Sequence, residues 1–261
     1  MRRGTMGSRA IMSGHSKWHQ IRHKKGAADA KRGKLFSKLT RAIIVAAREG
    51  GPDPAGNLAL QNAIEKAREA SMPKDNIERA IARGAGAAGD GTAYEHVTYE
   101  GYAPAGVAVF VEALTDNRNR TAAEIRHAFS KHDGSLGESG SVTWLFERKG
   151  VVLVPAEVDE DDLTLAAAEA GAEDVAREGS SYRVTSATEE LEAVRAALEA
   201  AGYPIESSQP TMVAKTTVSV EDEALARKII RLMDALEEND DVQDVYANFD
   251  IPERVLEAAA S

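Results

Sequence analysis

The chain has 261 residues, of which 43% are hydrophobic and 28% charged, and its formal net charge is -10. This length is enough for more than one domain core, and the absence of any apolar run of about eighteen residues excludes a transmembrane helix. Because the chain has no cysteine, disulfides, thiolate metal sites and cysteine nucleophiles are excluded as well. We therefore expect a soluble, cytoplasmic protein that does not bind a membrane.

The charge is divided unevenly along the chain. Residues 1–83 hold 18 Lys and Arg against 7 Asp and Glu, a net of +11, whereas the remainder holds 14 against 35, a net of -21. Clustered cations repel one another, and a polyanion relieves that repulsion and releases its counterions. The first third therefore predicts a nucleic-acid partner, and the acidic remainder should avoid one over most of its surface.

Residues 1–11 (MRRGTMGSRAI) are basic but lack the apolar stretch of a secretory signal. We expect them to be an extension or leader without a fold, with Met12 as an alternative start. The positive charge is densest over residues 14–41, where Asp29 is the only acid. Candidate nucleic-acid-binding residues in its first part are Lys17, Trp18, Arg22, His23, Lys24, Lys25, Lys31 and Arg32.

Two residue types in this segment allow more than one interpretation. Trp18 could stack on an unpaired base, although a tryptophan at helical spacing is more often packed in a core. His15, His19 and His23 recur every four residues and would share one face of a helix. Only one acid is nearby and the neighbouring lysines oppose a cation, so we expect no metal and favour histidines that hydrogen-bond beside phosphate.

The region from about residue 35 to 83 has helical periodicity. On a helical wheel an apolar arc (Leu35, Leu39, Ile43, Ala46) is separate from a basic arc of about 80°. The basic arc adds the candidates Lys34, Lys38, Arg41 and Arg48. The motif EGGPDP ends this helix, and further helices are expected at 57–70 and from Pro73 to Gly84. Lys74 is a candidate phosphate ligand because it lies at a helix N-terminus.

We expect residues 12–84 to form a basic helical domain and residues 85–92 to be a Gly-rich linker. A G-x-G-x-x-G pattern begins at Gly84, but it follows a helix and precedes a strand, whereas a dinucleotide-binding loop needs the opposite context. We therefore expect no cofactor.

Beyond the linker the hydrophobic pattern alternates, which predicts strands and helices in an α+β fold. Strands are expected at 94–101, 106–114 and 141–147, with a helix at 120–132. The next run has the ferredoxin-like order βαββαβ, with strand 150–154, helix 160–170, strands 173–177 and 181–185, helix 188–201 and a strand near 204–207. A strand at 211–220, a helix at 222–237 and a strand at 242–249 follow. We expect two ferredoxin-like α/β domains, one (149–208) inserted in the other (93–148 plus 209–251), and a tail at 252–261.

The segment TDNRNRTAAEIRHAFSKH (115–132) places Arg118 and Arg120 at a strand-to-helix junction. We include both as candidates for nucleic-acid binding, although turn chemistry alone explains the Asp and Asn residues around them. His127, His132 and Asp133 have no nucleophile or oxyanion motif nearby, so we expect no enzymatic activity.

Several long segments resemble the YebC/PmpR family, which includes the mitochondrial translational activator of cytochrome oxidase. They are MSGHSKWHQIRHKKGAADAKRGKLFSKLTR, AAREGG-DP, ASMPKDNIERAI-RG, YEGYAPAGVAVFVEALTDNRNRTAAEIRHAFSKHDGSLGESGSVTWLFERKG and DVQDVYANFDI. The similarity runs from Met12 to Ile251; Gly26 stands where alanine is usual, and His19 where a small or polar residue is common. The resemblance implies a helical N-terminal domain and two α/β domains, the last inserted in the second. It also implies either a DNA-binding transcriptional regulator or a ribosome-associated factor that relieves stalling, notably at proline runs.

We therefore predict a regulator of gene expression that binds nucleic acid through residues 14–48. The family label favours promoter DNA. The alternative is ribosomal RNA, and the residues themselves mildly favour it, because no helix-turn-helix signature is legible and a basic segment with an aromatic suits irregular RNA. A second alternative is a protein-interaction scaffold with a basic docking arm. The target sequence, the ribosomal state and the oligomeric state stay open.

Overall fold

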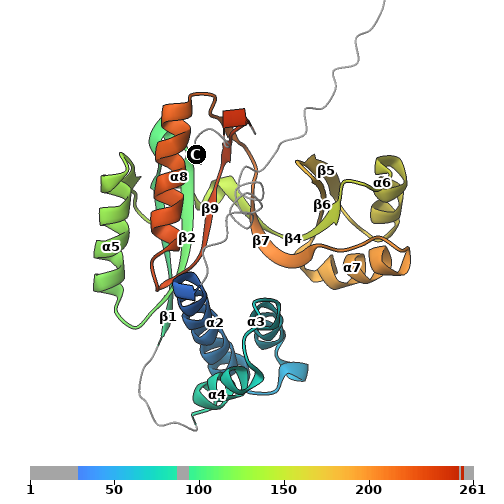
Figure 1. The fold of residues 1–261 in the computed structure, drawn as a ribbon, viewed down its shortest axis with the longest axis horizontal. Helices are drawn as coiled ribbons and strands as arrows, with labels where there is room; N and C mark the ends of the chain where they lie inside the picture. The colour runs from blue at the N-terminus through green and yellow to red at the C-terminus, as the bar shows by residue number, and fades with distance from the viewer. Residues whose placement is uncertain (1–28, 87–93, 253, 256–261) are drawn as a thin grey trace, which may run out of the picture.

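The structure is a computed structural model that describes residues 29–86, 94–252 and 254–255, with only the backbone described for residues 29–31. A group of helices lies beside two domains that each combine a four-stranded sheet with two helices (Figure 1). This architecture confirms the predicted α+β class, with an N-terminal helical region followed by two α/β units, one of them inserted in the other.

The helical domain packs two shorter helices against the long helix α2. Its elements are α2 (Asp29–Gly50), the 3-10 helix η1 (Pro54–Gly56), α3 (Leu58–Glu69) and α4 (Lys74–Gly84). The predicted apolar arc is buried at three of its four positions, but Leu35 is 44% exposed. The reason is that α4 approaches α2 at Ile44 and Ala47, more than two helical turns beyond Leu35.

The first α/β domain is built on an antiparallel sheet with the strand order β3-β1-β2-β9. Helices α5 and α8 pack on one face of this sheet and enclose a large apolar core (Figure 1). The elements are β1 (Glu95–Tyr102), η2 (Pro104–Gly106), β2 (Ala108–Thr115), α5 (Arg118–Lys131), β3 (Ser135–Leu136), α8 (Glu223–Glu237) and β9 (Val242–Ala247), with a small parallel pair, β8 (Val218–Ser219) and β10 (Phe249–Asp250).

The inserted unit has the ferredoxin-like element order, and its antiparallel sheet has the strand order β5-β6-β4-β7. Its elements are β4 (Phe146–Pro155), α6 (Glu160–Glu169), β5 (Asp174–Glu178), β6 (Ser181–Ser186), η4 (Thr188–Glu190), α7 (Leu191–Ala200) and β7 (Ser207–Ala214). The predicted boundaries between the inserted domain and the first α/β domain, near residues 148 and 208, lie within strands β4 and β7. Both strands continue toward the first α/β domain.

The expectation of two separate strands at 141–147 and 150–154 was wrong. A 3-10 helix, η3 (Thr143–Leu145), precedes one continuous strand, β4. Gly150 does not break the strand: it pairs with Ser186 on one side and Pro210 on the other. Its lack of a side chain serves close packing, because a Cβ there would lie 2.8 Å from the Cβ of Leu191.

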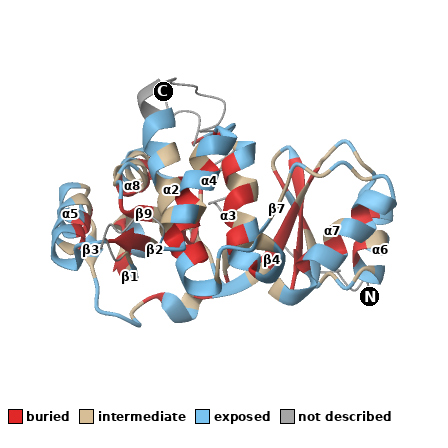
Figure 2. Ribbon diagram, turned by 90° about the horizontal axis from the view of Figure 1, so that it is seen from below, coloured by how far each residue is buried: buried red, intermediate tan, exposed pale blue. Residues whose placement is uncertain are grey.

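The two α/β domains are joined by an apolar cluster on the second face of the first sheet. Phe110 and Tyr246 from β2 and β9 pack there against Val142, Phe146 and Ala214. Figure 2 shows the buried strands between helices whose outer faces are exposed. The helical domain shares no such cluster with its neighbours among the described residues. Its core is contacted by one side chain from outside the domain, the partly buried Tyr94. The helical domain is therefore attached differently from the two sheet domains.

Candidate nucleic-acid interface

The structure places the candidate residues in three different settings. Six of them, Lys17, Trp18, Arg22, His23, Lys24 and Lys25, lie outside the described residues. Lys31 lies in the first turn of α2, and only its backbone is described. Arg32 is exposed on α2, as is Arg48 in its last turn.

Three candidates on the basic arc of α2 contact the end of α8, about 200 residues away in the chain. Lys34 donates from Nζ to the carbonyl oxygen of Glu238 at 3.2 Å, and Lys38 donates to the carbonyl oxygen of Glu237. Arg41 donates from Nη1 to the Asp240 carbonyl and to the Asp241 carboxylate, both at 2.6 Å. The predicted basic face is thus real, and in this structure it binds protein oxygens.

Asp241 connects this face to the first α/β domain. Its side chain is 4% exposed, and besides Arg41 it accepts hydrogen bonds from Arg120 at 2.8 Å, Thr121 at 2.7 Å and Thr115 at 3.2 Å. Burial would raise the pKa of the Asp241 carboxyl, but the hydrogen bonds from Arg120 and Thr121 and the charge of Arg41 together lower it below its ordinary value. Asp241 is therefore ionised at neutral pH and holds two cations from different domains.

Arg118 and Arg120 differ despite their common position at the start of α5. The pKa of Arg120 is raised, chiefly by its hydrogen bond to Asp241 and then by the one to Asp116. Arg118 is 67% exposed, and its guanidinium lies 3.7 Å from the Glu95 carboxylate. Arg118 is therefore the more accessible of the two for a phosphate, and Arg120 is part of the folded framework.

Lys74 begins α4 and its side chain is 85% exposed, but its surroundings are not uniformly basic. Its Nζ lies 3.4 Å from the Glu78 carboxylate, and Arg79 bonds to Asn76 and to the Asp75 carbonyl. Helices α3 and α4 are separated by four residues, which is the spacing of a helix-turn-helix. The sequence prediction did not recognise this spacing. The exposed face of α4 alternates cations and acids, so phosphate would meet repulsion there as well as attraction.

Sequence reasoning also missed the residue that joins α2 to α3. Asn57 is 6% exposed; its Oδ1 accepts the backbone N–H of Leu60 at the start of α3, and its Nδ2 donates to the carbonyls of Ala46 and Gly51. An Asn directly before an apolar helical pattern is a legible N-cap signal. Its two bonds back to the end of α2 have no such signal.

A second missed feature is a loop that a buried carboxylate anchors. Glu100 accepts the backbone N–H groups of Gly140, Val142 and Thr143 at 2.7, 2.7 and 2.8 Å. Burial would raise the pKa of Glu100, but these bonds and that of the Thr143 side chain lower it. The anchored loop presents Trp144, which is 65% exposed and donates its indole N–H to Ser141.

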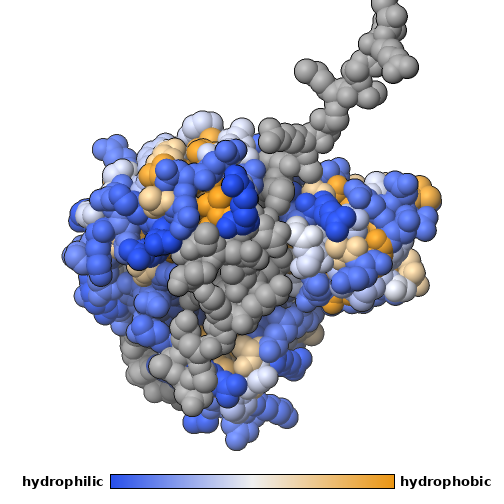
Figure 3. Space-filling model, turned by 45° about the horizontal axis from the view of Figure 1, so that its top comes forward, coloured by the Kyte–Doolittle hydropathy of each residue, from blue (hydrophilic) through white to orange (hydrophobic). Residues whose placement is uncertain are grey.

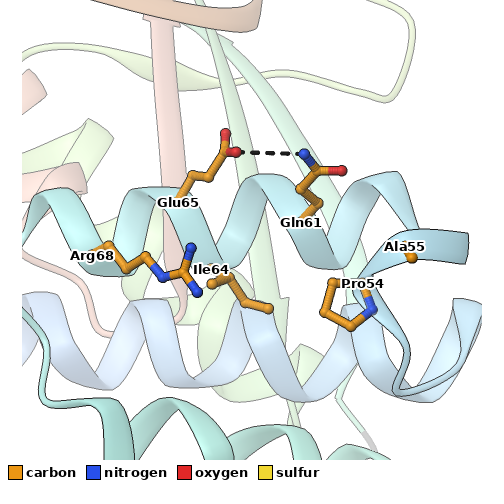
Figure 4. Close-up of a pocket in the computed structure, with 6 residues that line it drawn as sticks. All are labelled: Pro54, Ala55, Gln61, Ile64, Glu65 and Arg68. Carbon is orange, nitrogen blue, oxygen red and sulfur yellow. Dashed lines mark hydrogen bonds between the residues drawn. The ribbon is translucent and has the colours of Figure 1, made fainter.

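The described surface offers no enclosed pocket that resembles an active site. The open depression drawn in Figure 4, about 320 Å³, is lined by side chains of η1 and α3, with Gln61 bonded to Glu65 at 3.5 Å. Within the described residues no cluster of three or more His, Asp or Glu side chains is arranged to hold a metal ion. No described helix has the length and apolar character needed to cross a membrane. Among the described residues coloured in Figure 3, hydrophilic ones predominate on the face in view.

The chain is similar to proteins of one family over almost its whole length. Residues 16–87 match the family model described as the TACO1/YebC protein N-terminal domain, and residues 94–249 match the TACO1/YebC second and third domain. A probable transcriptional regulatory protein of Rubrobacter xylanophilus is 62% identical over 95% of this chain and 100% of its own length. A probable transcriptional regulatory protein of Dictyoglomus thermophilum is 55% identical over 95% of this chain and 99% of its own length. The crystal structure of a conserved hypothetical protein from Aquifex aeolicus is 55% identical, with a TM-score of 0.80, and the match covers 91% of this chain and 98% of that one.

Proposed function

Because the chain belongs to the TACO1/YebC family, we propose that it is a non-enzymatic, cytoplasmic regulator of gene expression that binds nucleic acid through its basic N-terminal region. The names of its relatives support a role in regulation. The observation that carries the proposal is the charge distribution: +11 over residues 1–83 against -21 over the remainder. A polyanion is attracted to the first region and repelled by the second, which orients the protein on its partner.

Promoter DNA is the first candidate ligand, because relatives are called probable transcriptional regulatory proteins. Ribosomal RNA is the second, and the mixed charge of α4 favours it. In a helix-turn-helix the second helix enters the major groove between two phosphate backbones, but α4 exposes Asp75 and Glu78 beside Lys74 and Arg79. A basic face on a single long helix suits the irregular surface of folded RNA instead.

The test compares two charge reversals of equal size. Lys24→Glu/Lys25→Glu/Arg32→Glu reverses three cations of the basic region and keeps Lys34, Lys38 and Arg41 as they are. The control, Lys131→Glu/Lys228→Glu/Arg231→Glu, makes the same change on exposed positions of the first α/β domain. Binding of a labelled DNA duplex and of a labelled RNA hairpin is measured by fluorescence anisotropy at several salt concentrations. Neutralisation of about six phosphates gives a log–log slope near -5 for the duplex.

We expect the first variant to lose most of its affinity and about one unit of slope for each lost contact, and the control to lose little. Equal losses in both variants would mean that only net charge matters, which would refute binding through the N-terminal region. Sedimentation with ribosomes, before and after nuclease treatment, separates the two ligands. If none of these nucleic acids is bound by the unaltered protein, the protein-scaffold alternative takes the place of this proposal.

A further inference from the structure

We propose that the end of α8 is an intramolecular competitor for the basic face of α2, and that nucleic acid displaces it when the protein binds. The contact is between Lys34, Lys38 and Arg41 on one side and residues 237–241 on the other; we call it the α2–α8 contact. This inference rests on the proposed function, because it assigns the same face to a polyanion.

The acceptors in the contact resemble those of a phosphate backbone. The three cations are met by a row of oxygens, from the carbonyls of Glu237, Glu238 and Asp240 and from the Asp241 carboxylate. The last carbonyls of a helix carry about half a negative charge. Closely spaced oxygens with negative charge are also what a nucleic-acid backbone offers, so the two ligands of α2 are chemically alike and mutually exclusive.

The sequence of the α8 end is unfavourable unless a cation faces it. Residues 237–241 read EENDD, with four acids at the end of a helix. Helix C-termini favour Lys, Arg or His and disfavour acids because of the macrodipole. The segment is thus a binding site for cations, and α2 supplies them. When α2 separates from the end of α8, the acids of residues 237–241 lose their cations. A polyanion bound to α2 then supplies new acceptors for those cations.

Outside the α2–α8 contact the attachment is small: the partly buried Tyr94 packs against the helical core, and two further contacts are polar. Arg41 lies over the ring of Tyr94 at 5.5 Å, and His96 lies 3.7 Å from the Glu49 carboxylate on the exposed surface. Polar contacts of this kind are individually weak and are screened by salt. The two α/β domains, in contrast, share the buried cluster around Phe110 and Phe146. Relative motion is expected where domains meet through small polar interfaces, so the helical domain is the one that moves.

With the contact present, the apparent affinity equals the intrinsic affinity multiplied by the fraction of molecules in which the contact is open. Asp241→Asn weakens it by removing the charge opposite Arg41, and Asp240→Asn is the matched control. Asp240 is an exposed neighbour whose carbonyl bonds to Arg41 and whose side chain does not enter the described contact. We expect Asp241→Asn to bind an RNA hairpin and a DNA duplex about five- to tenfold more tightly, and Asp240→Asn to stay within about twofold of the unaltered protein.

A second experiment does not depend on Asp241, which also bonds within its own domain. The chain has no cysteine, so Leu35→Cys/Glu238→Cys carries the only two thiols, both at exposed positions. Leu35 is next to Lys34, and Glu238 enters the described contact through its backbone carbonyl. A thiol-reactive linker with an internal disulfide joins them and holds the contact closed. We expect the linked protein to bind the same hairpin and duplex at least about tenfold more weakly, with recovery when the linker is reduced.

Domain movement is measured by energy transfer between dyes on Leu58→Cys in α3 and Ala123→Cys in α5, both exposed. Transfer should change when the hairpin is added, and Asp241→Asn should show part of that change without it. If the linked and reduced proteins bind equally and transfer stays constant, the inference is wrong while the proposed function stands. If no protein binds either nucleic acid, both are overturned.

Discussion

Replacement of Asn57 by Ala tests whether one side chain holds α2 and α3 together. Asn57 is almost fully buried, and it bonds the first turn of α3 and the last turn of α2 at the same time. Ala removes the N-cap of α3, which costs about 1 kcal/mol. It also leaves the carbonyls of Ala46 and Gly51 without their side-chain donor, at about 1 kcal/mol each. We expect the helical domain to lose about 3 kcal/mol in free energy of unfolding.

Hydrogen exchange read by mass spectrometry measures this loss within the domain, without the assumption that three domains unfold together. Amides of the buried segments of α2 and α3 should exchange roughly a hundredfold faster, since about 1.4 kcal/mol corresponds to a factor of ten. Amides of the inserted unit serve as the internal control and should keep their rates.

Asn57→Asp separates the two roles of the side chain. Asp is as good an N-cap as Asn, but it has no N–H to donate to Ala46 and Gly51 and brings a carboxylate against both carbonyls. We therefore expect Asn57→Asp to be at least as destabilising as Asn57→Ala. Normal protection in Asn57→Asp would refute the reasoning, because it would mean that the cap alone accounts for the effect.

Three further predictions follow from the same structure. A Cβ at Gly84 would lie 2.5 Å from the Ile44 carbonyl, so Gly84→Ala should destabilise the helical domain by about 1–3 kcal/mol in the same exchange experiment. At Gly33 nothing lies within 4 Å of such a Cβ, so Gly33→Ala should be neutral or slightly stabilising. Because the pKa of Glu100 is lowered in the folded protein, its hydrogen bonds contribute stability above the unfolded pKa, near 4.3. This contribution is lost as the pH falls through the folded value. Amides of the loop that Glu100 anchors should therefore lose protection on acidification, and Glu100→Gln should abolish that dependence. Arg118→Ala should leave the free energy of unfolding nearly unchanged, and Arg120→Ala should lower it by about 1 kcal/mol after a discount for solvent screening. The double variant should bind nucleic acid more weakly. An unchanged affinity would exclude this loop from the interface.

The sequence predicted the elements of the fold well where the signal is local. Apolar periodicity, the Pro and Gly residues after α2, and Pro73 before α4 locate the end of α2 and both ends of α3 and α4 within a few residues. The start of α2 was missed, because the helix begins at Asp29 and not near residue 35. The predicted basic face of α2 also depends only on spacing along one helix, and Lys34, Lys38 and Arg41 do lie on one side. Their assignment to nucleic acid is a separate statement, which stays a prediction for all fifteen candidate residues.

Errors arose where a residue serves a contact distant in the chain. The predicted separate strands at 141–147 and 150–154 are one such error, because Gly150 lies within the continuous strand β4. A glycine is placed there because Leu191 packs where a side chain would be. Leu35 fits the apolar arc of α2, but α3 and α4 cover only the later turns. The oxygens that meet Lys34 and Lys38 are backbone carbonyls, and a carbonyl has no residue type to read. Only the acids of residues 237–241, unfavourable at a helix end, were a usable signal.

The two kinds of attachment between domains should respond to solution conditions in opposite ways. Salt weakens the α2–α8 contact through screening, whereas it leaves burial of Phe110, Phe146 and Tyr246 unaffected or strengthens it. Acid acts likewise, since protonation of Asp241 removes the charge that Arg41 and Arg120 share. Because its folded pKa is lowered, that loss begins only below the ordinary value near 3.9. At neutral pH the α2–α8 contact is therefore governed by ionic strength and by competing polyanions, of which a nucleic acid is one.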